Sequence, residues 1–158
     1  MQIIDIVDVD VTNYKKTSMF IVTPRCSMKC NRDCGKNVCQ NEHLLTVNPK
    51  DYDNDKLITR YKSNPLTHAV VVGGMEPFDT FDSLYNFIKD FRATCSDDIV
   101  IYSGYNENEI APLISRLKQF DNIIVKYGRF QPGATKHYDE ILGVNLASDN
   151  QYAKVLVS

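Results

Sequence analysis

Residues 69–74 read Ala69-Val70-Val71-Val72-Gly73-Gly74, and this short apolar run decides the fold. Four consecutive apolar residues without polar alternation are typical of a strand that is buried on both faces, as strands of parallel sheets are. The two glycines end the strand, and Met75-Glu76-Pro77 follows them. The run therefore predicts an interior strand of a parallel sheet.

Further strands are expected on both sides of this one. Apolar runs occur at residues 19–22, 99–102 and 122–126, and a fifth strand is expected at 141–146. Helices are expected between them, over residues 51–63, over residues 81–93 with Thr80 as the cap, and after a capping pair formed by Asn106 and Glu109.

The alternation of strands and helices implies right-handed parallel crossovers. At roughly 25–30 residues per unit, a chain of 158 residues falls short of a full eight-unit barrel. We expect an α/β fold, either a partial (β/α) barrel or an open, curved, mostly parallel sheet with helices outside. No linker divides the sequence, so residues 1–158 are predicted to form a single domain.

Composition narrows the class of protein. Hydrophobic residues make up 43% and charged residues 24% of the chain, and the formal net charge is −2. This charge favours neither nucleic acid nor an acidic membrane surface as a partner. No apolar run approaches the roughly 20 residues of a membrane span, and residues 1–12 do not resemble a signal peptide. We expect a cytoplasmic protein, whose thiols stay reduced.

Four of the five cysteines lie close together, as Cys26-x3-Cys30-x3-Cys34-x4-Cys39. Clustered cysteines in a reduced compartment indicate a metal site, and thiolates suit both zinc and iron–sulfur clusters. The run lacks the paired spacing of structural zinc sites. Three thiolates on one loop after a strand suit a [4Fe–4S] cluster with one open iron. Four cations accompany the thiols and would offset their charge: Arg25, Lys29, Arg32 and Lys36.

Three segments that follow predicted strands are expected to meet. They are the cysteine loop, residues 73–77 and residues 103–105. In parallel α/β sheets the ligand site lies at the carboxyl ends of the strands. The sequence therefore predicts one site that combines the thiols with the segments around Glu76 and Ser103.

The order of these motifs resembles the radical S-adenosylmethionine superfamily, and within it the small activating proteins of anaerobic ribonucleotide reductase. The resemblance extends over residues 18–152. The matching segments are Cys26-Ser27-Met28-Lys29-Cys30, Val38-Cys39-Gln40-Asn41, Gly73-Gly74-Met75-Glu76-Pro77, Ile101-Tyr102-Ser103-Gly104-Tyr105, Tyr127-Gly128-Arg129-Phe130 and Ala147-Ser148-Asp149-Asn150-Gln151. This chain departs from the family where Met75 is inserted, where Tyr127 replaces Asp and where Ala147 replaces Gly.

The resemblance implies a [4Fe–4S] cluster held by Cys26, Cys30 and a third cysteine. The family spacing is C-x3-C-x2-C, and no choice of three cysteines reproduces it here. Cys39 is favoured as the third ligand because Gln40-Asn41 continues the family pattern. Cys34 remains the alternative.

The resemblance also implies residues that bind the cofactor S-adenosylmethionine. Glu76 would accept hydrogen bonds from its ammonium, and Gly73 and Gly74 would let the backbone approach. Val38 would contact the adenine, and Ser103 the methionyl carboxylate or the ribose. No catalytic residue is assigned.

The implied function is reductive cleavage of S-adenosylmethionine to a 5′-deoxyadenosyl radical, which generates a glycyl radical on a partner enzyme. The implied partners are the large subunit of an anaerobic ribonucleotide reductase and an electron donor such as flavodoxin or ferredoxin. The alternatives are a non-catalytic zinc-binding interaction module that uses all four clustered cysteines, and a cluster-binding protein for electron transfer or sensing.

Overall fold

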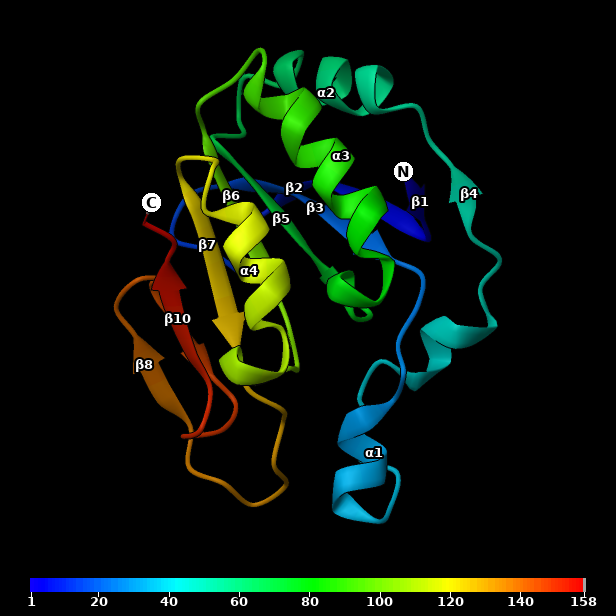
Figure 1. Ribbon diagram of the computed structural model, residues 1–158, viewed down its shortest axis with the longest axis vertical. Coiled ribbons are helices and arrows are strands. Elements are labelled where there is room, and N and C mark those ends of the chain that lie inside the picture. The colour runs from blue at the N-terminus through cyan, green and yellow to red at the C-terminus, as the bar shows by residue number, and fades with distance from the viewer. Residues whose placement is uncertain (158) are drawn as a thin grey trace.

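The computed structural model describes residues 1–157 and consists of one central sheet with helices packed on it (Figure 1). Six strands form this sheet, in the spatial order β10 (Tyr152–Val155), β7 (Ile123–Tyr127), β6 (Asp98–Tyr102), β5 (Ala69–Gly74), β3 (Ser18–Thr23) and β2 (Asp5–Asp10). The four strands from β3 to β7 run parallel, and the two edge strands are antiparallel to their neighbours. The predicted α/β class with a mostly parallel sheet is confirmed.

Helices cover one face of the sheet. In Figure 1, α3 (Phe81–Arg92) and α4 (Ala111–Leu117) lie in front of the strands, and α2 (Asn54–Lys62) lies along the top. The short turns η2 (Pro77–Thr80) and η3 (Glu107–Glu109) lead into α3 and α4. The apolar stripes of the three helices bury Leu57, Leu84 and Leu117 completely. Val70 and Val72 of β5 belong to the same core, because alternate residues of a strand point to the same face.

The opposite face of the sheet is divided into two parts. One part is covered by Tyr14, Leu142 and Leu146, which pack on Ala69 and Val71 in a second core. The two-stranded hairpin of β8 (His137–Asp139) and β9 (Val144–Leu146) supplies part of that cover. The other part, toward the carboxyl ends of the parallel strands, holds a pocket.

Three expectations about local structure need correction. Residues 141–146 do not add a strand to the main sheet, because they form the end of the β8–β9 hairpin, and β10 takes the edge position instead. Helix α2 begins at Asn54, since the side chain of Asp53 accepts hydrogen bonds from two backbone N–H groups and caps it there. Thr80 stands at the start of α3 but makes no capping hydrogen bond.

The remaining elements are β1 (Gln2–Ile3), β4 (Lys50–Asp51), α1 (Lys29–Cys34) and η1 (Glu42–Thr46). Ile3 of β1 is buried in the core beneath the helices. Helix α1 extends from the end of β3 at the lower edge of the molecule in Figure 1. Within residues 1–157, no helix combines the length and the apolar character that crossing a membrane requires.

A glycine beside the site fixes the turn after β7. Gly128 has φ +96°, and a Cβ on it would lie 2.7 Å from the carbonyl oxygen of Asn150. Gly133 has a similar φ of +81° with no atom within 4 Å of its Cβ position. We expect Gly128→Ala to lower the free energy of unfolding by about 2–4 kcal/mol and Gly133→Ala by about 1 kcal/mol, since only the first adds a clash to backbone strain.

Urea unfolding of both variants measures the difference. Equal losses of stability in the two variants would show that the contact with Asn150 does not matter.

Candidate metal and cofactor site

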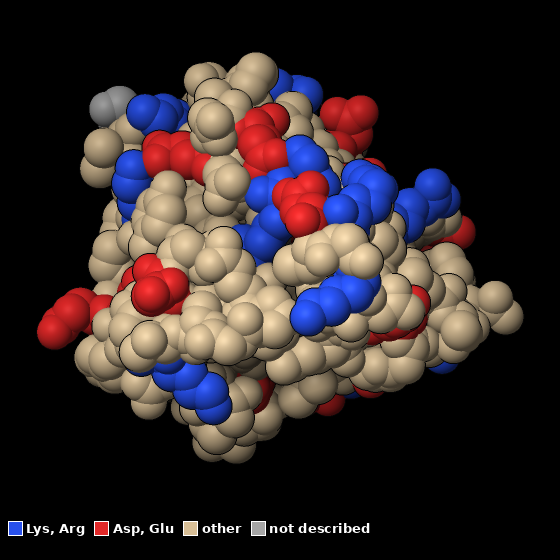
Figure 2. Space-filling view, turned by 90° about the horizontal axis from the view of Figure 1, so that it is seen from below, with Lys and Arg blue, Asp and Glu red and all other residues tan. Residues whose placement is uncertain are grey.

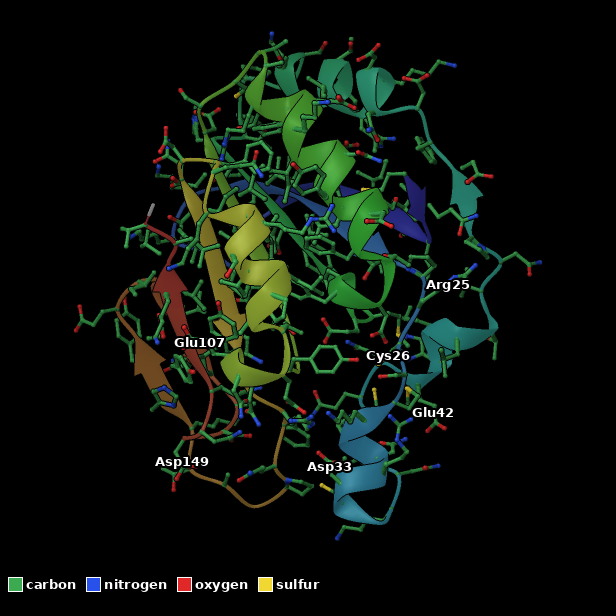
Figure 3. The ribbon with its side chains drawn as sticks, viewed as in Figure 1. Arg25, Cys26, Asp33, Glu42, Glu107 and Asp149 are labelled. Atoms are coloured by element: carbon green, nitrogen blue, oxygen red, sulfur yellow. The ribbon has the colours of Figure 1, made fainter. Side chains whose placement is uncertain are left out.

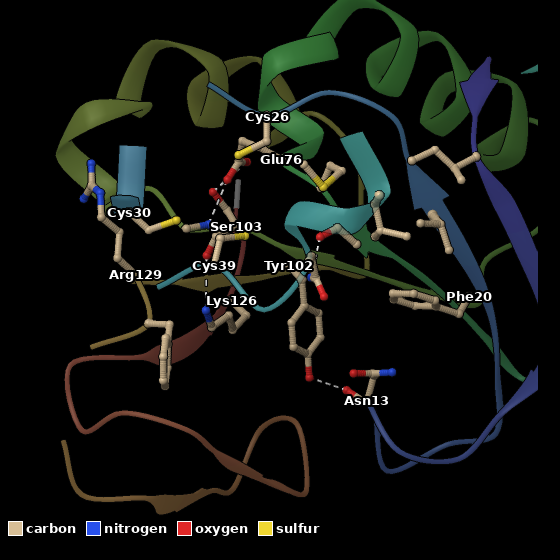
Figure 4. A pocket seen from close by; sticks show the side chains of 18 of the residues that line it. Asn13, Phe20, Cys26, Cys30, Cys39, Glu76, Tyr102, Ser103, Lys126 and Arg129 are labelled. Atoms are coloured by element: carbon tan, nitrogen blue, oxygen red, sulfur yellow. Dashed lines mark hydrogen bonds between the residues drawn. The ribbon is translucent and has the colours of Figure 1, made fainter. Parts of the chain in front are cut away.

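The carboxyl ends of the parallel strands meet at a pocket of about 670 Å³ (Figure 4). Cys26 follows β3, Glu76 follows β5 and Ser103 follows β6, so each comes from a different strand end. All three line the pocket, and Glu76 and Ser103 are 6% and 1% exposed. Segments that are far apart in the sequence therefore converge, as the strand order predicts.

The residues singled out from the sequence divide into two groups. Those that line the pocket are Cys26, Cys30, Cys39, Gly74, Glu76 and Ser103. Val38, Gly73 and Cys34 are not part of its lining. Cys34 is the last residue of α1, about 6 Å along the helix axis from Cys30.

Gly73 has a role in the packing below the pocket. A Cβ on Gly73 would lie 3.1 Å from Cβ of Tyr102 and 3.3 Å from Cε2 of Phe20. Tyr102 and Phe20 both line the pocket, and Figure 4 shows their rings at the end of it away from the cysteines. Glycine at this position therefore leaves room for the ring of Phe20 and for Cβ of Tyr102.

Asn31 explains how the eight residues between Cys30 and Cys39 return the chain to the pocket. They form most of α1 and a turn at Gly35, whose φ is +65°. The side-chain oxygen of Asn31 then accepts hydrogen bonds from the backbone N–H groups of Val38 and Cys39, each at 2.9 Å. This pair of bonds holds Cys39 beside the helix that carries Cys30.

The cysteine loop is anchored to the neighbouring strand ends. The N–H of Glu76 donates to the carbonyl oxygen of Arg25 at 2.8 Å, next to Cys26. The carboxylate of Asp79 accepts hydrogen bonds from the backbone N–H of Ser27 and from the hydroxyl of Tyr105. These contacts fix the start of the loop against the segments that follow β5 and β6.

Charged side chains tie the outer side of the loop to the rest of the molecule. Lys29 and Arg129 both pair with Glu109, and Arg129 also lies 2.8 Å from Asp33. The hydrogen bond from Arg129 lowers the pKa of Glu109 to about 2. Figure 2 looks onto this end of the molecule and shows Lys and Arg side chains gathered with carboxylates between them. Figure 3 places Cys26 and Asp33 at the same end of the molecule, at and just before α1.

Glu76 is the buried carboxylate of the pocket. Its oxygens accept hydrogen bonds from the hydroxyl of Ser103 at 2.9 Å and from the N–H groups of Gly104 and Phe78 at 2.8 and 3.2 Å. Burial raises the pKa of Glu76 to about 7, although the three hydrogen bonds oppose the shift. The carboxylate of Glu76 is therefore suited to bind a cationic ligand, because an ammonium would offset the free-energy cost of its buried charge.

The donor set at the pocket fits an iron–sulfur cluster. Cys26, Cys30 and Cys39 have free thiols that are partly accessible. Burial raises the pKa of Cys26 to about 11, and burial and the nearby Cys39 raise that of Cys30. Iron binding would displace the thiol protons and neutralise the resulting charge. Within residues 1–157, no three His, Cys, Asp or Glu side chains lie close enough together to bind a single ion.

Sequence reasoning assigned no role to two residues that line the pocket. Met75, inserted relative to the family pattern, is 5% exposed and packs with Ile4 and Val22 close to Cys26. Lys126 is 6% exposed and lines the pocket from β7. A charged residue inside an otherwise apolar strand was the available signal for Lys126, because the period of two places it on the same face as Ile124.

Comparison with known proteins supports a 4Fe–4S cluster in this chain. Residues 16–151 match the model of a family described as a 4Fe–4S single cluster domain. Searches of curated proteins and of solved structures give no match. Since the family match spans most of the sequence and includes all three pocket thiols, the chain belongs to the 4Fe–4S single cluster domain family, whose members are radical S-adenosylmethionine-like domains.

Proposed function

We propose that this protein is a radical S-adenosylmethionine enzyme that generates a glycyl radical on a partner protein. The observation that carries the proposal is the convergence of Cys26, Cys30 and Cys39 with the buried carboxylate of Glu76 on one pocket. Three thiols supply the ligands of a cluster with one open iron, and the carboxylate supplies an acceptor for the ammonium of the cofactor.

The cofactors supply the redox chemistry. A cluster held by Cys26, Cys30 and Cys39 would supply the one-electron reduction, from a donor such as flavodoxin or ferredoxin, that cleaves S-adenosylmethionine to methionine and a 5′-deoxyadenosyl radical. The protein ligates through its thiols, orients the methionyl end through Glu76, and holds that carboxylate in place with Ser103 and Gly104.

The pocket also has room for more than the ionic end of a ligand. Phe20 and Tyr102 form an aromatic wall away from the thiols. We place the nucleoside and the reacting part of the target toward this wall, because apolar surroundings exclude water from a radical. The proposed target is a backbone glycine, whose Cα–H hydrogen passes to the 5′-deoxyadenosyl radical to give 5′-deoxyadenosine. The partner that we propose is the large subunit of an anaerobic ribonucleotide reductase.

Product analysis tests this proposal. The reconstituted protein, incubated anaerobically with S-adenosylmethionine and dithionite, should release 5′-deoxyadenosine and methionine in equal amounts. A co-encoded reductase subunit added to the mixture should acquire a glycyl radical signal in electron paramagnetic resonance. Cofactor cleavage without a radical on the reductase would reject the partner but keep the enzyme class. An intact cofactor would reject the enzyme class.

A further inference from the structure

Lys126 is a buried cation whose hydrogen bonds connect two of the strand-end turns. Its Nζ donates to the carbonyl oxygen of Gly128 at 2.8 Å and to that of Ser103 at 3.3 Å. In the described part of the chain, no carboxylate oxygen lies within 4.0 Å of Lys126. Burial lowers the pKa of Lys126 to about 8, although the charge of Glu76 opposes the shift. Because an unpaired buried charge is costly, its presence requires an explanation.

One peptide unit joins Lys126 to Glu76. The carbonyl group of Ser103 and the N–H group of Gly104 belong to the same planar peptide. Lys126 donates to the carbonyl oxygen of this peptide. The N–H of the same peptide donates to the carboxylate of Glu76 at 2.8 Å. The cation therefore stands at the negative end of the peptide dipole and the carboxylate at the positive end (Figure 4).

This arrangement favours one orientation of the peptide. Each charge polarises the peptide unit in the same sense, which strengthens both hydrogen bonds. The hydroxyl of Ser103, on the same residue, donates to the other oxygen of Glu76 at 2.9 Å. The position of the carboxylate thus depends on a turn that Lys126 holds from the opposite side.

We propose that Lys126 is a positioning residue of this pocket, which acts on bound S-adenosylmethionine through the Ser103–Gly104 peptide and Glu76. The inference rests on the proposed function, since it concerns the same ligand. It assigns to Lys126 no contact with the ligand. Removal of Lys126 should make the turn at Ser103 and Gly104 more mobile and weaken the hydrogen bond between Glu76 and the ligand's ammonium.

A double-mutant cycle tests this dependence. The dissociation constant of S-adenosylmethionine is measured for reconstituted wild-type protein, Lys126→Met, Glu76→Gln and the double variant. We expect Lys126→Met to weaken binding about tenfold and Glu76→Gln about 10- to 100-fold. The double variant should bind as Glu76→Gln does, because Lys126 has no effect without the carboxylate. A double variant whose affinity falls by the product of the two single factors would overturn the proposal.

Decarboxylated S-adenosylmethionine supplies the second readout. This ligand keeps the ammonium, so Lys126→Met should weaken its binding by the same factor. A loss confined to S-adenosylmethionine itself would show that Lys126 binds the carboxylate directly and would also overturn the proposal. Lys126→Gln, whose amide still donates hydrogen bonds, should recover part of the affinity, and it replaces Lys126→Met in the cycle if the methionine variant fails to fold.

Two controls separate the possible failures. Lys154→Met removes an exposed cation on β10 and should leave the dissociation constant unchanged. The iron content and the cluster signal without ligand should be equal in the wild type and in the Lys126 variants. Wild-type protein that does not bind S-adenosylmethionine would reject the proposed function itself, whereas wild-type binding with independent effects would reject only the role of Lys126.

Discussion

The Cys39→Ala variant is expected to lose its iron–sulfur cluster, while Cys34→Ala keeps it. Cys39 lines the pocket with Cys26 and Cys30, and two hydrogen bonds to Asn31 hold its backbone there. Cys34 ends α1 and does not line the pocket. Loss of a direct ligand should reduce bound iron by more than about tenfold, since loss of an outer-shell partner alone costs roughly 10- to 100-fold in metal affinity.

Iron and sulfide analysis after anaerobic reconstitution measures this difference. The two variants form a matched pair, because each removes one thiol from the same loop. Equal cluster content in Cys39→Ala and wild type, together with a loss in Cys34→Ala, would assign the third ligand to Cys34. Loss of metal in both variants would favour a site that uses all four thiols.

The Glu76→Gln variant is expected to retain its cluster and to bind S-adenosylmethionine about 10- to 100-fold more weakly. The carboxylate is buried, and three hydrogen bonds fix it at the pocket. Replacement by a neutral amide of the same shape removes a charge-assisted hydrogen bond to an ammonium. Equilibrium dialysis of the reconstituted variant with labelled S-adenosylmethionine measures the affinity.

Glu107→Gln is the matched control. Glu107 is an exposed carboxylate that pairs with Lys154, and Figure 3 shows it near β10, apart from Cys26. Its replacement should leave the affinity unchanged. An equal loss in both variants would point to a general effect of charge, and unchanged binding by Glu76→Gln would remove Glu76 from the site.

The central strands and helices could be predicted from the sequence because their patterns of apolar residues are clear. Residues of β5 are buried on both faces, and α3 buries one stripe from Phe81 to Phe91. The edge strands were harder to predict. In β2, valines alternate with aspartates and are partly exposed, since an edge strand has a neighbour on one side only. Residues 141–146 are apolar because they cover the sheet, not because they extend it.

The sequence predicted only those features of the site that depend on the order of the strands. The carboxyl ends of parallel strands meet, so the cysteines, Glu76 and Ser103 were expected together. The choice between Cys34 and Cys39 depends on how far α1 extends and on the hydrogen bonds of Asn31, which spacing does not reveal. The bridge from Lys126 to Glu76 runs through a backbone peptide, and no side-chain motif marks such a contact.

Electron paramagnetic resonance of the reconstituted, reduced protein tests the central claim most directly. The account predicts a [4Fe–4S]⁺ signal whose shape changes when S-adenosylmethionine is added, because a three-cysteine cluster leaves one iron open to the cofactor. A colourless protein that holds one zinc ion, or a cluster signal that S-adenosylmethionine leaves unchanged, would contradict it.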